Sequence, residues 1–351
     1  MTFMLPNGKR IQLFLLVLFG CVHPTHAHAA SCTTQSQMTS AQRDSLVASA
    51  HSFVAQLRSA NVEAIRTNTL PSVAADFSGI AASVKTLQPL VQSATITVQA
   101  LYLLDGSTNS PNSARTDFFC GSPVVTLNFT NLPPGTYELA IVHATGVPQP
   151  QQIAIILSRN TSNSWMLAGF FAKPMIAAGH DGLWYWISAR KRAETKMNWD
   201  AWLYYNIAFN LLNPANFLSS SNLEKLHHEA SSIRPDNLPG ERPLSLNAYG
   251  TSFTLTAIDS TTAFGGLDLD VSYSPDAVQA AQLHDPPAAR AQVTQVMSAL
   301  LELHPELQTA FHGIWVHASQ QNASLFSLEL PMNLIASSPK PPSVSANFIT
   351  P

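Results

Sequence analysis

The order of hydrophobic and polar positions divides the chain into a helical block, a block of strands, a second helical block and a mixed C-terminal block. After Thr39, apolar residues recur at helical spacing. Thr39 and Gln42 have the spacing of a capping box, which predicts a helix that begins here and ends near Arg58. Further helical patterns cover 62–67 and 73–91, the second interrupted by a proline near its end.

The pattern then changes to segments rich in β-branched and aromatic residues, separated by turn residues. Strands are expected over 94–104, 124–129, 137–144, 152–159 and 165–172. Helices followed by antiparallel strands with short turns indicate the α+β class.

Two or three helices followed by a meander that ends in WMLAGFF, residues 165–171, resemble the nuclear transport factor 2-like (cone) fold over residues 38–174. The resemblance implies a cone-like domain over 30–174. It also implies two kinds of function. Some members are isomerases or dehydratases with a polar dyad inside the cone, and many others bind ligands or mediate assembly.

The second helical block covers 175–233. The spacing of Ala189, Ala201, Tyr205 and Ala208 is similar to one tetratricopeptide unit, with small residues where two helices cross. Since a solenoid needs about three units, we expect a single helical hairpin packed on a neighbouring element.

The remainder of the chain is predicted to form a linker, a small domain and a tail. Residues 234–243 are rich in proline and charge, which is typical of a linker. The domain over 244–336 is expected to have the order β-β-α-β-β, with strands over 252–258, 267–273, 313–318 and 325–330 and a helix over 288–303. The Pro/Ser-rich tail, 337–351, is expected to be disordered.

The N-terminus has the pattern of a secretory signal peptide over residues 1–29. Lys9 and Arg10 precede a mainly apolar run that ends at Phe19, and a small-x-small cleavage pattern ends at Ala29. A lipobox-like segment that would lipidate Cys21 is the alternative. No later stretch has the about 20 apolar residues of a transmembrane helix. We therefore expect a periplasmic or secreted protein.

Charge, cysteine count and missing motifs exclude some classes of function. The net charge is −3 and lysine and arginine form no long run, which argues against nucleic-acid binding. Cys32 and Cys120 remain after cleavage and predict one disulfide in an oxidising compartment. No phosphate-binding loop, dinucleotide fingerprint, nucleophile elbow or zinc-protease motif is present, so no cofactor is expected.

Five polar residues could face a cavity in the cone: Tyr102, Asp117, Tyr137, Glu138 and His143. A cone enzyme would use His143 as general base, paired with Asp117. The alternative is that these residues are structural parts of a sheet.

Aromatic residues crowd the segment 184–205. We identify Trp184, Trp186, Trp202 and Tyr205 as a candidate ligand-binding surface. Their helical spacing is also typical of core residues between packed helices.

The histidines offer weaker candidates. His180 and Asp181 could form a proton relay, but Asp181 is better explained as the N-cap of a following helix. The other histidines lack metal-ligand spacing: His227 beside His228, and His304, His312 and His317. Glu329 carries no pattern, and no metal site is predicted.

These observations favour an exported, non-catalytic binding or assembly protein of the cell envelope or extracellular space. Its partner could be a small molecule, a glycan or a protein. Two alternatives stay open: a cofactor-free cone-fold isomerase or small-molecule hydrolase, and a carbohydrate or peptide binder that uses the aromatic cluster.

Overall fold

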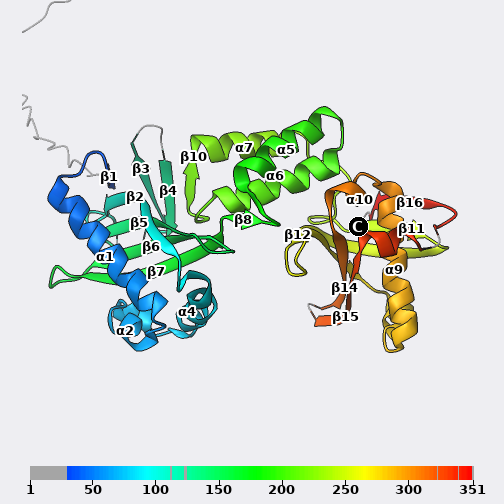
Figure 1. Cartoon of the computed structure of the whole chain (residues 1–351), viewed down its shortest axis with the longest axis horizontal. Coiled ribbons are helices and arrows are strands. Elements are labelled where there is room, and N and C mark those ends of the chain that lie inside the picture. The colour runs from blue at the N-terminus through cyan, green and yellow to red at the C-terminus, as the bar shows by residue number, and fades with distance from the viewer. Residues whose placement is uncertain (1–29, 111–112, 122–124, 322, 339, 350–351) are drawn as a thin grey trace, which may run out of the picture.

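The computed structural model describes residues 30–349, apart from positions 111–112, 122–124, 322 and 339 (Figure 1). The predicted signal peptide and the alternative lipidation site at Cys21 lie outside the described residues. Within them, blocks of helices and mostly antiparallel sheets follow one another, so the chain has the expected α+β class.

Four helices follow a short first strand. Their bounds are α1 (Ser40–Arg58), α2 (Val62–Thr67), α3 (Pro71–Ala74) and α4 (Ser78–Val91). The Thr39 side chain accepts from the Gln42 backbone N–H and the Gln42 side chain accepts from that of Thr39, so the predicted capping box is confirmed. The predicted break at Pro89 is wrong. Pro89 lies inside α4, whose last residue Val91 is fully buried, and the helical region is instead interrupted between α3 and α4.

The helices cover one face of a five-stranded sheet with the order β1-β2-β5-β6-β7. Its strands are β1 (Ser31–Thr34), β2 (Thr95–Asp105), β5 (Thr136–Thr145), β6 (Gln151–Arg159) and β7 (Trp165–Pro174). Side chains of β5 alternate between two cores, as the period of a strand requires. Ala140 and Val142 pack with the helices, and Leu139 and Ile141 face the other way.

A small second sheet covers that other face. It has the order β10-β4-β3, with β3 (Arg115–Cys120), β4 (Val125–Thr130) and β10 (Leu218–Ser220). Phe118 and Leu127 are fully buried between the two sheets. The predicted Cys32–Cys120 disulfide is confirmed, and it ties β1 to β3 across 88 residues of sequence.

Next comes a helical block that Figure 1 places between the N-terminal sheets and the C-terminal domain. After the small hairpin β8 (Ile176–Ala177) and β9 (His180–Asp181), its helices are α5 (Gly182–Glu194), α6 (Asn198–Leu212) and α7 (Ser221–Ser232). Helices α5 and α6 pack closely at Gly182, where an added Cβ would lie only 2.6 Å from Leu212 Cγ. Ala189 and Ala208 are fully buried, as expected for small residues at a helix crossing.

The C-terminal domain is a six-stranded sheet with the order β15-β14-β13-β12-β11-β16, in which β13 and β14 are parallel. The strands are β11 (Leu244–Ala248), β12 (Thr251–Thr261), β13 (Asp268–Ser274), β14 (Gly313–Gln320), β15 (Ala323–Pro331) and β16 (Val344–Phe348). The helices are α8 (Ala277–Gln282), α9 (Pro286–Leu303), α10 (Leu307–Ala310) and α11 (Met332–Ala336).

The expected order β-β-α-β-β accounts for four of these strands and for α9, and it misses β11 and β16. Strand β16 also corrects the prediction of a disordered tail over 337–351. Residues 344–348 alternate apolar and polar positions, and they pair with β11 while Val344, Ala346 and Phe348 pack on the core. This local alternation outweighs the Pro/Ser-rich composition around it.

One hydrophobic core joins the helical block to the C-terminal sheet. Tyr204 of α6 packs edge-on against Phe311, and its hydroxyl donates to the Ala310 carbonyl at 2.9 Å. Residues 234–243, expected as a linker, contain no helix or strand, although Leu238 is buried in this core. Among the described residues, no helix is both long enough and apolar enough to cross a membrane.

Candidate functional site

The two residues of the predicted catalytic dyad are not brought together. On β5, His143 alternates with Val142 and Ala144 of the helical core, so its side chain is on the face that the β3–β4 layer covers. On β3, Asp117 alternates with Phe118, which is buried between the sheets, so Asp117 lies on the outer face of the β3–β4 layer and points away from the five-stranded sheet. Asp117 instead accepts a hydrogen bond from Arg115 Nε at 2.8 Å. The β3–β4 layer thus separates the predicted base from its acid.

Another polar residue of the predicted cone set, Glu138, is fully buried on the helical side of β5. Its Oε2 lies 2.5 Å from Ser49 Oγ of α1, whereas its Oε1 is buried without a hydrogen-bond partner. Burial raises the pKa of Glu138 to about 8, and the Ser49 contact lowers it only in part. The group is therefore mostly a neutral carboxylic acid at pH 7.

The predicted aromatic surface is largely a core. Trp186 and Tyr205 are buried, and Trp202 is partly buried against the same core. Trp184 alone of the four is exposed, at 39 %, and it stacks on His180 with 3.7 Å between the ring centroids.

Glu229 of α7 connects three helices through this aromatic group. It accepts from Trp186 Nε1 at 2.7 Å and from Arg190 Nε and Nη2, both at 2.7 Å. The Tyr205 hydroxyl donates to the same carboxylate at 3.4 Å. Two charge-assisted bonds to Arg190 hold the pKa of Glu229 below its ordinary value. These contacts show that the aromatic residues pack around a polar centre, the Glu229 carboxylate, where the three helices meet.

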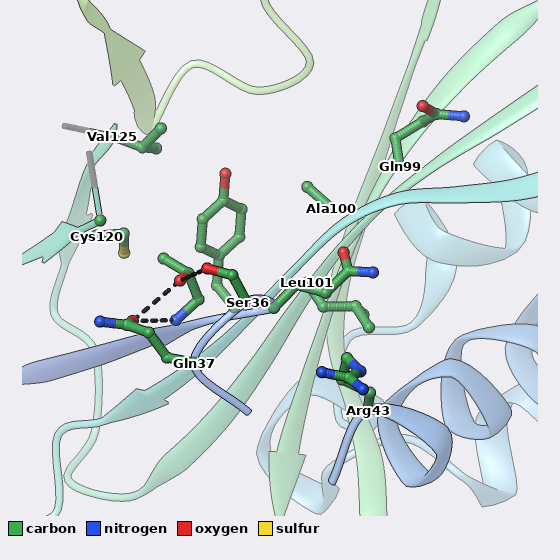
Figure 2. A pocket seen from close by; sticks show the side chains of 12 residues that line it. Ser36, Gln37, Arg43, Gln99, Ala100, Leu101, Cys120 and Val125 are labelled. Atoms are coloured by element: carbon green, nitrogen blue, oxygen red, sulfur yellow. Dashed lines mark hydrogen bonds between the residues drawn. The ribbon is translucent and has the colours of Figure 1, made fainter. Parts of the chain in front are cut away.

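A pocket of about 760 Å³ lies beside the disulfide. Figure 2 shows Cys120 and Val125 on one side of it, and Gln99 and Arg43 on the other. Glutamine, serine and tyrosine side chains supply most of its polar groups, and burial raises the pKa of Tyr102 so that its hydroxyl stays protonated. The described residues that line the pocket therefore offer neutral hydrogen-bonding groups and one cation, Arg43.

This pocket lies at an open edge of the five-stranded sheet. Strand β1 pairs only with Tyr102–Asp105, the last four residues of β2. Past Thr34 the chain turns away toward α1, so Thr95–Leu101 has no strand partner on that side among the described residues. A register shift between Val98 and Ala100 places a bulge in the middle of this edge.

A second polar site lies at one end of the C-terminal sheet. Asp268 begins β13, His312 directly precedes β14, and Glu329 lies near the end of β15. His312 Nδ1 is 2.9 Å from Asp268 Oδ1, and ligand atoms of all three residues lie within 4.8 Å of one another. Asp268 is fully buried, and its Oδ2 and Glu329 Oε1 have no hydrogen-bond partner. These residues could hold a metal ion.

Sequence reasoning missed this site because the three residues are far apart in the chain and carry no spacing motif. The local signals were two glycines, Gly266 and Gly313, at positions where a Cβ would collide with these side chains. The N-cap prediction for Asp181 is confirmed, because its Oδ1 accepts from the Trp184 backbone N–H at 2.8 Å.

No protein-family model, curated protein or solved structure matches the chain.

Proposed function

We propose that the mature chain works outside the cytoplasm as a non-catalytic binding protein that holds an extended peptide segment of a partner along the free edge of β2. The observation that carries the proposal is the edge Thr95–Leu101, which has no strand partner among the described residues and whose last three residues, Gln99–Leu101, line the 760 Å³ pocket. Backbone groups at such an edge form a template for an added strand.

The chain itself demonstrates this mode of pairing. β1 adds antiparallel to the other half of β2 and is held there by the Cys32–Cys120 bond. A partner strand would continue the row where β1 stops. The edge has room for about seven residues, or roughly 23 Å of extended chain.

The residues of this edge support a binding role. The segment TITVQAL contains no charged residue and no proline, although exposed edges are commonly protected by both. Thr95, Thr97 and Gln99 are exposed at alternate positions, so they could pair with polar side chains of the added strand. Arg43 at the pocket wall could receive an acidic group of the same peptide.

Export is part of the proposal. It rests on the N-terminal signal pattern, and the disulfide is the type of bond that persists in an oxidising compartment. The resemblances to the cone fold and to one tetratricopeptide hairpin are also part of the proposal, because both kinds of unit are compatible with a role in binding. An enzyme that uses His143 with Asp117 is not proposed, because the two side chains lie on opposite sides of the β3–β4 layer.

The test is a selection of peptides from a random display library on the chain recovered, without reductant, from an export-competent host. Selected peptides are then measured by calorimetry and by hydrogen exchange. We expect them to slow the exchange of amides in Thr95–Leu101. Gln99→Trp, which fills the pocket, should weaken binding at least 10-fold, the effect of about 1.4 kcal/mol.

Ser83→Trp is the matched control, because Ser83 is exposed and lines a different pocket of about 530 Å³. It should leave the affinity unchanged. The proposal fails if no peptide is enriched over the Gln99→Trp variant, or if the enriched peptides protect other amides. It also fails if neutral oligosaccharides bind the pocket without protecting the β2 amides.

A further inference from the structure

We propose that Asp268, His312 and Glu329 form a binding site for a divalent transition-metal ion, with Zn²⁺ as the best match. This site is independent of the peptide-binding edge, since it lies on a different sheet.

The fold brings the three residues to one end of the C-terminal sheet. Asp268 pairs with Gly313 in the parallel β13–β14 ladder, and Glu329 pairs with Trp315 in the next ladder. His312 is the residue before Gly313. Its backbone is fixed on both sides, because its N–H donates to the Leu267 carbonyl at 2.7 Å and its carbonyl accepts from Met332 N at 2.9 Å.

Two glycines keep the space between the side chains open. A Cβ on Gly313 would lie 2.5 Å from Glu329 Oε1 and 2.8 Å from Asp268 Oδ1, so both carboxylate oxygens converge above this glycine. A Cβ on Gly266 would lie 2.5 Å from His312 Cβ and Cγ. Any larger side chain at either position would push the three residues apart.

Charge is the reason to expect a cation. Two carboxylates converge here, and the buried Asp268 Oδ2 and Glu329 Oε1 have no hydrogen-bond donor. Two carboxylates whose oxygens converge on the same space above Gly313 repel each other. A bound cation would satisfy these oxygens and remove the repulsion.

The donor set selects the metal. One imidazole nitrogen with two carboxylate oxygens suits Zn²⁺ and similar transition ions, whereas Ca²⁺ and Mg²⁺ prefer oxygen ligands alone. Zinc bonds of about 2.0–2.2 Å place tetrahedral ligand atoms about 3.4 Å apart. Ligand atoms within 4.8 Å therefore need only small side-chain movements. The His312 side chain is 52 % exposed, so one coordination position would face water.

The test uses the untagged mature chain, stripped of metal with a chelator and titrated with ZnCl₂ by calorimetry. Zinc retained after gel filtration is measured by elemental analysis. We expect one zinc per chain. His312→Ala and Glu329→Gln should each weaken zinc binding by at least about 100-fold. This is the upper end of the loss of metal affinity seen when only a residue that supports a ligand is changed, and removing a ligand should cost no less.

His317→Ala is the matched control. His317 lies on β14 and is 3.3 Å from one carboxylate, that of Asp270, so removing it should leave zinc binding intact. Thermal unfolding separates lost ligation from lost folding: metal-free Glu329→Gln should melt no lower than the metal-free parent, but zinc should no longer raise its melting temperature. The proposal is overturned if the parent retains no zinc, or if zinc binding survives in the double variant His312→Ala, Glu329→Gln.

Discussion

Replacing Glu138 with glutamine should stabilise the protein at alkaline pH and leave its stability almost unchanged at acidic pH. The carboxyl is fully buried between β5 and α1, and Ser49 Oγ lies both 2.5 Å from Glu138 Oε2 and 2.8 Å from the Leu46 carbonyl. A hydroxyl has one proton to donate. A protonated Glu138 can donate to Ser49 while Ser49 donates to Leu46, whereas an ionised Glu138 competes with Leu46 for the Ser49 proton.

The sign and the magnitude follow from the raised pKa of Glu138. Between its ordinary value of 4.5 and the folded value of about 8, the folded state keeps a proton that the unfolded state has lost. Stability therefore falls as the pH rises through this interval. At about 1.4 kcal/mol for each pKa unit, the full loss is at most about 5 kcal/mol. Glutamine cannot ionise and should remove this loss.

The assay is urea denaturation of the disulfide-bonded chain between about pH 5 and pH 9, where both carboxyl forms of Glu138 are sampled. We expect Glu138→Gln to gain about 2–5 kcal/mol over the parent at the alkaline end. Asp200, whose pKa burial raises to about 6, titrates in both proteins and cancels in the comparison. Glu63→Gln, at an exposed position on α2, should have no effect. Identical pH profiles for the parent and Glu138→Gln would refute the reasoning.

Three further outcomes are expected. Reducing the Cys32–Cys120 bond should cost about 4–5 kcal/mol in the chain-entropy model, given its 88-residue separation, and denaturation with and without reductant measures this. Glu229→Gln should lower stability by about 2 kcal/mol, because the charge-assisted bonds that join the three helices are lost, and an unchanged melting temperature would contradict this. Trp184→Ala should cost only about 1 kcal/mol, because Trp184 is exposed and its ring contact with His180 is at the surface; a loss like that of a core tryptophan, about 3–5 kcal/mol, would contradict it.

Several features of the fold could be predicted because they depend on neighbouring residues. The Thr39 capping box and the Asp181 N-cap are local hydrogen-bond patterns, and both are present. The disulfide could be predicted because two cysteines remain after the expected cleavage of the signal peptide. Very short strands could not be predicted in this way. Leu218–Ser220 has only three residues and becomes a strand because it meets β4, about ninety residues earlier in the chain.

For the candidate sites too, the sequence indicated residue types but not their arrangement in space. The sequence suggested suitable residue types for a dyad in His143 and Asp117, but it could not show which face of each strand would meet another layer. For the proposed metal site the sequence offered no motif, because residues 268, 312 and 329 are far apart in the chain. The parallel β13–β14 pairing and the antiparallel β14–β15 pairing bring them together.

By itself, therefore, the sequence determined the class, the disulfide and most of the longer helices and strands, because periodicity, capping and cysteine count act over short ranges or need no geometry. Only the tertiary structure decided which strand edge stays open, which aromatic residues are buried and which carboxylates converge. Those properties depend on the order in which strands pair and on which face of each sheet another layer covers. Neither can be read from residues that are close together in the sequence.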